Sequence, residues 1–163
     1  MKNFLGTLAF AFIAIATVIL GIPYLIFYFG IAWLYEIGSF RFFGIIPIAT
    51  GIILWIWAAR DFIIHGKGTP APVYPPKQLV SERLFRIIRN PMYVAVTLII
   101  LGEAVLVGSF TLFIYTLLIW SLFHLFVVYY EEPINNKRFG SAYKDYLTSV
   151  PRWIPKLNFG RRR

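Results

Sequence analysis

The sequence predicts an all-α integral membrane protein with about four transmembrane helices. Of its 163 residues, 59% are hydrophobic and only 14% are charged. The charged residues are confined to short stretches between long apolar runs, which is the pattern of helices that lie in lipid. We expect one domain, residues 1–163, because two shorter pieces would each be too small to bury a useful core.

The first predicted span covers residues 4–34. No charged residue occurs between Asn3 and Tyr35, and a straight helix of that length would be about 50 Å long, well beyond the hydrocarbon layer of about 30 Å. A kink is expected at Gly21 and Pro23, because proline lacks a backbone donor and clashes with the preceding turn. A span followed by a re-entrant piece stays open as an alternative.

Three further spans are expected at residues 42–64, 91–107 and 110–130. Gly108 and Ser109 separate the last two, and a tight turn there would join them as a helical hairpin. The polar segments that remain are residues 65–90, with an extended first half and a short interfacial helix, and residues 131–163. In the second of these, aromatic residues recur at helical spacing, which predicts a helix that proline later ends.

The positive charges predict an orientation. With an even number of spans, Lys2 and the basic residues of both polar segments face one side of the membrane, and the other side has only Arg41. The positive-inside rule then places both termini and both polar segments in the cytoplasm. A net charge of +9 beside apolar spans indicates contact with anionic lipid headgroups rather than with nucleic acid.

The two polar segments are candidates for a single pocket at the cytoplasmic ends of the last two helices. Asn90 is a favoured N-cap and Pro91 suits a first helical turn, so a helix should begin here with its free amides facing the pocket. A capped helix without a ligand is the plainer interpretation. The chain has no cysteine, no histidine pair at metal spacing and no Ser/His/Asp arrangement, so we expect neither a metal centre nor a hydrolytic triad.

Ionisable residues near the membrane boundary need partners. Glu131 and Glu132 stand at the end of the fourth span, where adjacent carboxylates are costly unless they meet cations. The cations available are Arg89, Arg138 and Arg152. One glutamate faces a ligand, or the pair forms a structural ion pair. His124, about two turns deeper on the same face as Glu131, is either functional or a neutral histidine bonded to Tyr93 or another helix.

Five short motifs follow one another between Arg60 and Leu157. They are Gly66-Lys67-Gly68-Thr69-Pro70, Arg89-Asn90-Pro91-Met92-Tyr93, Glu131-Glu132-Pro133, Phe139-Gly140 with Tyr143 and Tyr146, and Val150-Pro151-Arg152. In this order and in a four-span chain they resemble the integral membrane methyltransferases, which include isoprenylcysteine carboxyl methyltransferase and phospholipid N-methyltransferases. Many members have histidine where this chain has Asn90, so a titrating role is not carried over to that position.

The resemblance implies that the protein binds S-adenosyl-L-methionine, releases S-adenosyl-L-homocysteine and methylates a lipid or lipid-modified acceptor. Cofactor contacts would come from Gly66, Gly68, Asn90, Tyr93, Glu131, Glu132 and Tyr143. The candidates for catalysis are Arg152, Arg138 and His124: the arginines would hold an anionic acceptor, and the histidine is a candidate base. Both a carboxylate acceptor and an amine acceptor stay open, as does the oligomeric state. Alternatives are an NADPH-dependent membrane reductase of related fold and a membrane scaffold without turnover.

Overall fold

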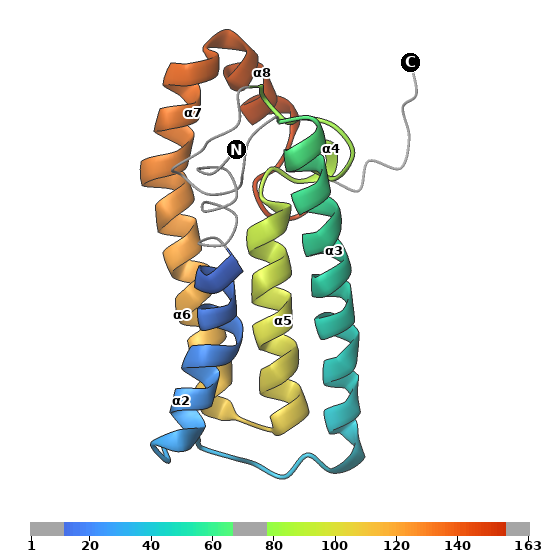
Figure 1. Ribbon diagram of the computed structural model, residues 1–163, viewed down its shortest axis with the longest axis vertical. Coiled ribbons are helices and arrows are strands. Elements are labelled where there is room, and N and C mark those ends of the chain that lie inside the picture. Colours follow the sequence, from blue (N-terminus) through green and yellow to red (C-terminus); the bar gives the residue numbers. More distant parts are fainter. Residues whose placement is uncertain (1–11, 67–77, 156–163) are drawn as a thin grey trace.

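The computed structural model describes residues 12–66 and 78–155, which form an upright bundle of apolar helices (Figure 1). All regular elements within these ranges are helical. The four apolar helices of the bundle are Phe12–Tyr28, Gly38–Ile64, Pro91–Val107 and Phe110–Phe139. The second and fourth, with 27 and 30 residues, are long and apolar enough to cross a membrane, and the other two are shorter. They lie where the sequence predicts four spans.

The first apolar helix ends at Tyr28, before the predicted limit at residue 34. Gly30 has a φ of +66°, a left-handed conformation that glycine adopts without strain. The chain then crosses the end of the bundle, where the amide of Tyr35 donates to the carbonyl of Gly108 at 2.8 Å. This corrects the far boundary of the predicted span 4–34, whose first residues, through 11, lie outside the described residues.

Pro23 and Pro133 each follow closely on a π-helical turn. These turns are η1 (Thr17–Gly21), which leads into α2 (Ile22–Tyr28), and η3 (Val127–Glu131), which leads into α7 (Glu132–Phe139). Proline lacks an N–H and its ring crowds the carbonyl four residues earlier. A π turn, in which an amide donates five residues back, admits the ring without ending the helix. The fourth apolar helix therefore continues beyond residue 130, the predicted end of the span, as far as Phe139.

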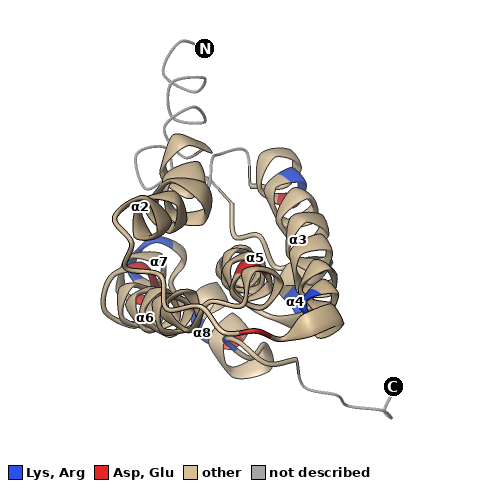
Figure 2. Ribbon diagram, turned by 90° about the horizontal axis from the view of Figure 1, so that it is seen from below, with Lys and Arg blue, Asp and Glu red and all other residues tan. Residues whose placement is uncertain are grey.

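The helix α5 (Pro91–Val107) occupies the centre of the bundle (Figure 2). On one side it packs along α3 (Ile45–Ile64), which the 3₁₀ turn η2 (Gly38–Gly44) precedes. On the other side it packs against α6 (Phe110–Phe126), to which it is joined through Gly108 in a left-handed conformation. The bounds of α5 are those predicted for the third span, and α5 and α6 form the expected hairpin.

Glycines allow α5 to approach its neighbour closely. A Cβ atom on Gly102 would lie 2.5 Å from the carbonyl oxygen of Gly44, and a Cβ atom on Gly51 would lie 2.6 Å from the carbonyl oxygen of Ala95. Small residues at such positions bring helix backbones together, which is how helices associate in lipid without a hydrophobic driving force. This packing fixes α3 against α5.

Gly102→Ala is expected to lower the free energy of unfolding by about 1–3 kcal/mol, because the added methyl group would meet backbone rather than a movable side chain. Gly21→Ala is a matched control, since its Cβ would come no nearer than 3.5 Å to the Thr17 methyl group. Thermal unfolding in detergent compares both variants with the wild type. Equal transition temperatures for Gly102→Ala and the wild type would contradict the close contact.

Three short helices gather at one end of the bundle (Figure 1). They are α4 (Leu84–Ile87), which is the helical part of the first polar segment, α7, and α8 (Ser141–Ser149). Gly140, with a φ of +58°, separates α7 from α8. Tyr143 and Tyr146, whose helical spacing the sequence shows, are buried in one cluster with Val150, and Phe139 packs against it.

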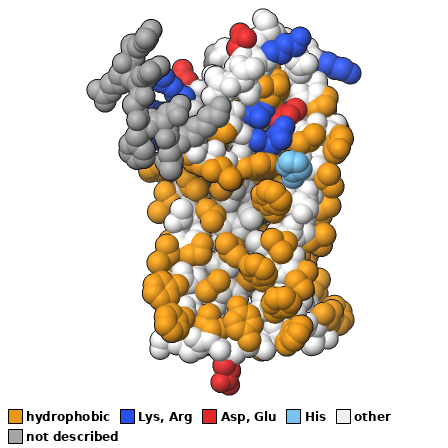
Figure 3. Space-filling model, turned by 180° about the vertical axis from the view of Figure 1, so that it is seen from behind, with side chains coloured by type: hydrophobic (Ala, Val, Ile, Leu, Met, Phe, Trp, Pro, Cys, Tyr) orange, Lys and Arg blue, Asp and Glu red, His pale blue; other side chains and the backbone are white. Residues whose placement is uncertain are grey.

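Polar and apolar side chains occupy different parts of the surface. On the face in Figure 3, basic side chains lie towards the end that carries the short helices, and hydrophobic side chains cover most of the rest. Exposed large side chains on the long helices include Ile53, Trp57, Leu118 and Leu122. Soluble proteins rarely expose apolar patches of this extent. The surface therefore indicates a membrane protein whose helices face lipid.

Candidate functional site

A cavity of about 300 Å³ lies at the end of the bundle that carries the short helices. Its polar wall consists of Arg89, Asn90, Tyr93, Glu131, Asn135, Tyr143 and Tyr146. Its apolar wall includes Ile15, Val18, Trp55, Phe62, Val96 and Phe123, from the first apolar helix, α3, α5 and α6. The volume is within the range of small-molecule sites. One cavity thus joins the two polar segments to the apolar interior of the bundle.

Tyr93 and Glu131 meet in the wall of this cavity. The Tyr93 hydroxyl donates to Oε1 of Glu131 at 2.5 Å, and both side chains line the cavity. Tyr93 stands in the first turn of α5 and Glu131 at the end of η3, so the hydrogen bond connects the ends of the hairpin helices. The structure therefore brings these two predicted site residues to one point.

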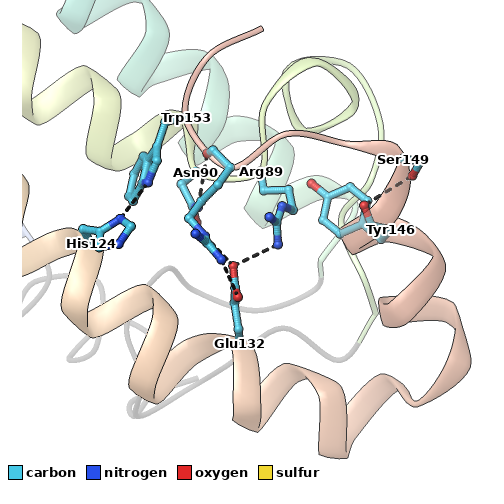
Figure 4. A network of polar contacts seen from close by, with 8 residues as sticks. Arg89, Asn90, His124, Glu132, Tyr146, Ser149 and Trp153 are labelled. Carbon is cyan, nitrogen blue, oxygen red and sulfur yellow. Dashed lines mark hydrogen bonds and ion pairs between the residues drawn. The ribbon is translucent and has the colours of Figure 1, made fainter. Parts of the chain in front are cut away.

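Glu132, next to the cavity-lining Glu131, accepts hydrogen bonds from two arginines (Figure 4). Nη1 of Arg89 donates to its Oε1 at 2.9 Å, while Nε and Nη2 of Arg152 donate to Oε1 and Oε2 at 2.8 and 3.0 Å. The hydrogen bonds to Glu132 raise the pKa of the Arg152 guanidinium. The side chains of Arg89 and Glu132 are only 10% and 15% exposed. Arg138, the third predicted cation, is exposed and forms no ion pair with the residues that the structure describes.

The C-terminal strap, residues 150–155, crosses the start of α5. The backbone amide of Arg89 donates to the carbonyl of Pro151 at 2.9 Å, and Nδ2 of Asn90 donates to the carbonyl of Arg152 at 3.3 Å. The helix does begin at Pro91, but Asn90 makes no side-chain capping bond. This corrects the predicted N-cap role: the side-chain amide of Asn90 binds the strap instead.

His124 is also bound to the strap. Nε1 of Trp153 donates to its Nδ1 at 3.1 Å, and its ring stacks on Trp120 with the ring centroids 5.8 Å apart. His124 does not line the cavity. The hydrogen-bond partner of His124 is thus the strap rather than Tyr93.

Two buried tyrosines, Tyr143 and Tyr146, line the cavity. The Tyr146 hydroxyl donates to the carbonyl of Phe85 at 2.6 Å and thereby ties α8 to α4. Burial raises the pKa of both Tyr143 and Tyr146 above the ordinary value for a phenol. Both groups therefore stay protonated at neutral pH and act as hydrogen-bond donors.

Two predicted cofactor-binding glycines remain. Gly66 is buried just beyond the end of α3 but does not line the cavity. Gly68 lies outside the described residues. Among the lining residues that the sequence did not single out, Asn135 comes one helical turn after Glu131, and this spacing was a usable signal. Trp55 had no such signal, because it is one apolar residue among many in an apolar helix.

Comparison with protein families gives one finding. A family model described as phospholipid methyltransferase matches residues 40–142, which is more than half of the chain. The matched region contains α3, α5, α6 and α7, together with Tyr93 and Glu131. A comparison with curated proteins gives no match.

Proposed function

The chain belongs to the phospholipid methyltransferase family, and we propose that it transfers a methyl group from S-adenosylmethionine to the headgroup amine of a phospholipid. The observation that carries this proposal is the cavity in which Tyr93 and Glu131 meet, because it has a polar end and an apolar end. A polar cofactor and a lipid acceptor need both kinds of surface in one place. From the distribution of lysine and arginine, we propose that this end of the bundle faces the cytoplasm.

The polar wall fits the groups of S-adenosylmethionine. Arg89 lines the cavity, and its guanidinium is the proposed contact for the cofactor carboxylate. Asn90 and Asn135 offer amides for the ribose hydroxyls, and the rings of Tyr93 and Tyr143 offer faces for the adenine or the cationic sulfur. When bound, S-adenosylmethionine supplies a methyl group on a positively charged sulfur, which keeps the S–C bonding pair as the amine takes the methyl group.

Glu131 is the proposed partner of the acceptor amine. A protonated amine has no lone pair, so the proton must leave before the N–C bond forms, and the carboxylate of Glu131 accepts it. The Tyr93 hydroxyl donates to Oε1 of Glu131 and thereby fixes the orientation of the carboxylate. The same negative charge also stabilises the cationic amine before deprotonation.

The apolar wall excludes water and receives the acyl chains. Ile15 and Val18 of the first apolar helix face the site together with Phe123 of α6. Methyl transfer depends chiefly on alignment of the donor and acceptor in a dry site. The apolar wall is the proposed source of the dry surroundings. Arg152, whose side chain is 29% exposed beside Glu132, is the proposed contact for the lipid phosphate. His124 positions the strap that carries Arg152.

Incubation of the purified protein in detergent with methyl-labelled S-adenosylmethionine and phosphatidylethanolamine, followed by mass spectrometry of the lipid extract, tests the proposal. We expect N-methylated headgroups. Label found only in the methyl ester of a prenylated cysteine would replace the amine acceptor by a carboxylate acceptor. Failure of the folded protein to bind S-adenosylmethionine or S-adenosylhomocysteine in calorimetry would reject the methyltransferase, and stabilisation by NADPH instead would favour the reductase.

A further inference from the structure

Tyr115 of α6 binds a backbone carbonyl of the first apolar helix. Its hydroxyl donates to the carbonyl oxygen of Val18 at 3.0 Å, and the residue is only 8% exposed. The two helices lie beside each other in the bundle (Figure 2). Val18 also lines the cavity. The hydrogen bond therefore connects the hairpin to the part of the first apolar helix that forms the apolar wall.

The Val18 carbonyl needs this donor because Pro23 removes the one that its own helix would supply. In the π turn η1, the amide of Ile22 donates to the carbonyl of Thr17, five residues back. The same spacing would pair the nitrogen of residue 23 with the carbonyl of Val18, but proline has no N–H. A carbonyl without a donor is costly among hydrocarbon side chains, where water cannot replace the missing partner. The Tyr115 hydroxyl supplies that partner.

The same hydrogen bond fixes where the first apolar helix stands against the hairpin. Contacts between apolar side chains have no preferred direction, whereas a hydrogen bond tolerates only a narrow range of lengths and angles. Ile15, one helical turn before Val18, also lines the cavity, and both side chains pack against the core cluster that contains Tyr115 and Val96. Because Ile15 and Val18 share one face of their helix, a shift of one carries the other with it.

We propose that Tyr115 is a positioning residue for the acceptor lipid. Through the carbonyl of Val18, it holds Ile15 and Val18 in the apolar wall against which the acyl chains pack. It touches neither the cofactor nor the reacting amine. This inference rests on the proposed function, because that function assigns the apolar wall to the lipid.

The test removes the hydroxyl and then returns a donor to the carbonyl by another route. Tyr115→Phe keeps the ring and loses only the hydroxyl. Pro23→Ala restores a backbone amide, which can donate to the Val18 carbonyl if the π turn persists. If that turn becomes α-helical instead, the amide of Ile22 makes the bond. Tyr129→Phe is the matched control, because Tyr129 is on the same continuous helix as Tyr115 and is 76% exposed.

Tyr115→Phe is expected to raise KM for phosphatidylethanolamine by about 5- to 10-fold, as the loss of one net hydrogen bond allows. Lipid binding in native mass spectrometry should weaken by the same factor. We expect little change in kcat at saturating lipid or in calorimetric binding of S-adenosylhomocysteine, because the hydrogen bond between Tyr93 and Glu131 stays intact. A residue with a merely structural role would weaken lipid and cofactor binding alike.

Addition of Pro23→Ala to Tyr115→Phe should return KM and lipid binding to wild-type values. Hydrogen exchange of the amides in residues 12–28 should rise in Tyr115→Phe and fall again in the double variant, and this readout needs no turnover. Tyr129→Phe should match the wild type in every measurement.

Unchanged lipid binding in Tyr115→Phe, equal weakening of lipid and cofactor binding, or a double variant no better than Tyr115→Phe overturns the inference. If Tyr115→Phe does not fold, the double variant must fold and bind lipid as the wild type does, and its failure overturns the inference as well. The expected changes in lipid binding without any methyl transfer would support the role of Tyr115 while rejecting the proposed reaction. A wild type that binds no phosphatidylethanolamine would reject both.

Discussion

Glu131→Gln is expected to lower kcat for methyl transfer to phosphatidylethanolamine by about 10²- to 10⁴-fold, the range that general base catalysis contributes. Glutamine has nearly the same shape and can still accept the hydrogen bond that Tyr93 donates to Oε1 of Glu131. It cannot take a proton from the amine and does not carry the negative charge that stabilises it. Steady-state kinetics at saturating lipid measures the change.

Two further measurements separate this loss from a general one. Calorimetric binding of S-adenosylhomocysteine and the thermal unfolding transition should change little in Glu131→Gln, because the hydrogen bond to Tyr93 persists. Glu82→Gln is the control for removal of a charge at the same end of the bundle, since Glu82 is exposed and does not line the cavity. Turnover in Glu131→Gln close to that of the wild type would show that another group takes the proton.

Glu132→Ala should destabilise the protein by about 3–5 kcal/mol, because removal of one member of a buried ion network leaves the others unpaired. Arg89 is almost enclosed, and Arg152 uses two nitrogens on Glu132. Release of Arg152 would also loosen the C-terminal strap at the start of α5. Thermal unfolding in detergent measures the loss, and limited proteolysis should show earlier cleavage within residues 150–155.

Lys144→Ala is the matched control for Glu132→Ala, because Lys144 is exposed and forms no ion pair with the described residues. It should unfold as the wild type does. Glu132→Gln keeps hydrogen-bond acceptors without the charge, and it should fall between the wild type and Glu132→Ala. If Glu132→Ala were as stable as Lys144→Ala, the network would contribute no stability and would serve the ligand alone.

The family was predictable from short motifs, and the match over residues 40–142 confirms that prediction. The boundaries of the third span were also predictable, because Asn90-Pro91 and Gly108-Ser109 mark its ends in the residues themselves. The ends of the first and fourth helices were not. Pro133 indicates a helix boundary in any local interpretation, and only the π turn before it lets the helix continue.

The sequence also could not predict which side chains Glu131 and Glu132 bind, because this too depends on tertiary packing. Glu131 and Glu132 are adjacent and chemically identical, yet one meets Tyr93 in the cavity and the other meets Arg89 and Arg152 beside it. Neighbouring residues on a helix point in directions about 100° apart, so the rotation of α6 and η3 about their axis decides which glutamate faces the cavity. Three arginines were available in the sequence, and nothing local separates Arg138 from the two that bind.

The sequence by itself determined three features of this protein: its apolar helices, an end rich in positive charge and the motifs of one methyltransferase family. These follow from composition and from residues near one another in the chain, where hydrophobicity and backbone restriction act directly. The tertiary structure decided which side chains meet. The pairing of Tyr93 with Glu131 and the bond from Trp153 of the strap to His124 join segments far apart in the sequence. Such contacts depend on how helices rotate and pack, which no local pattern encodes.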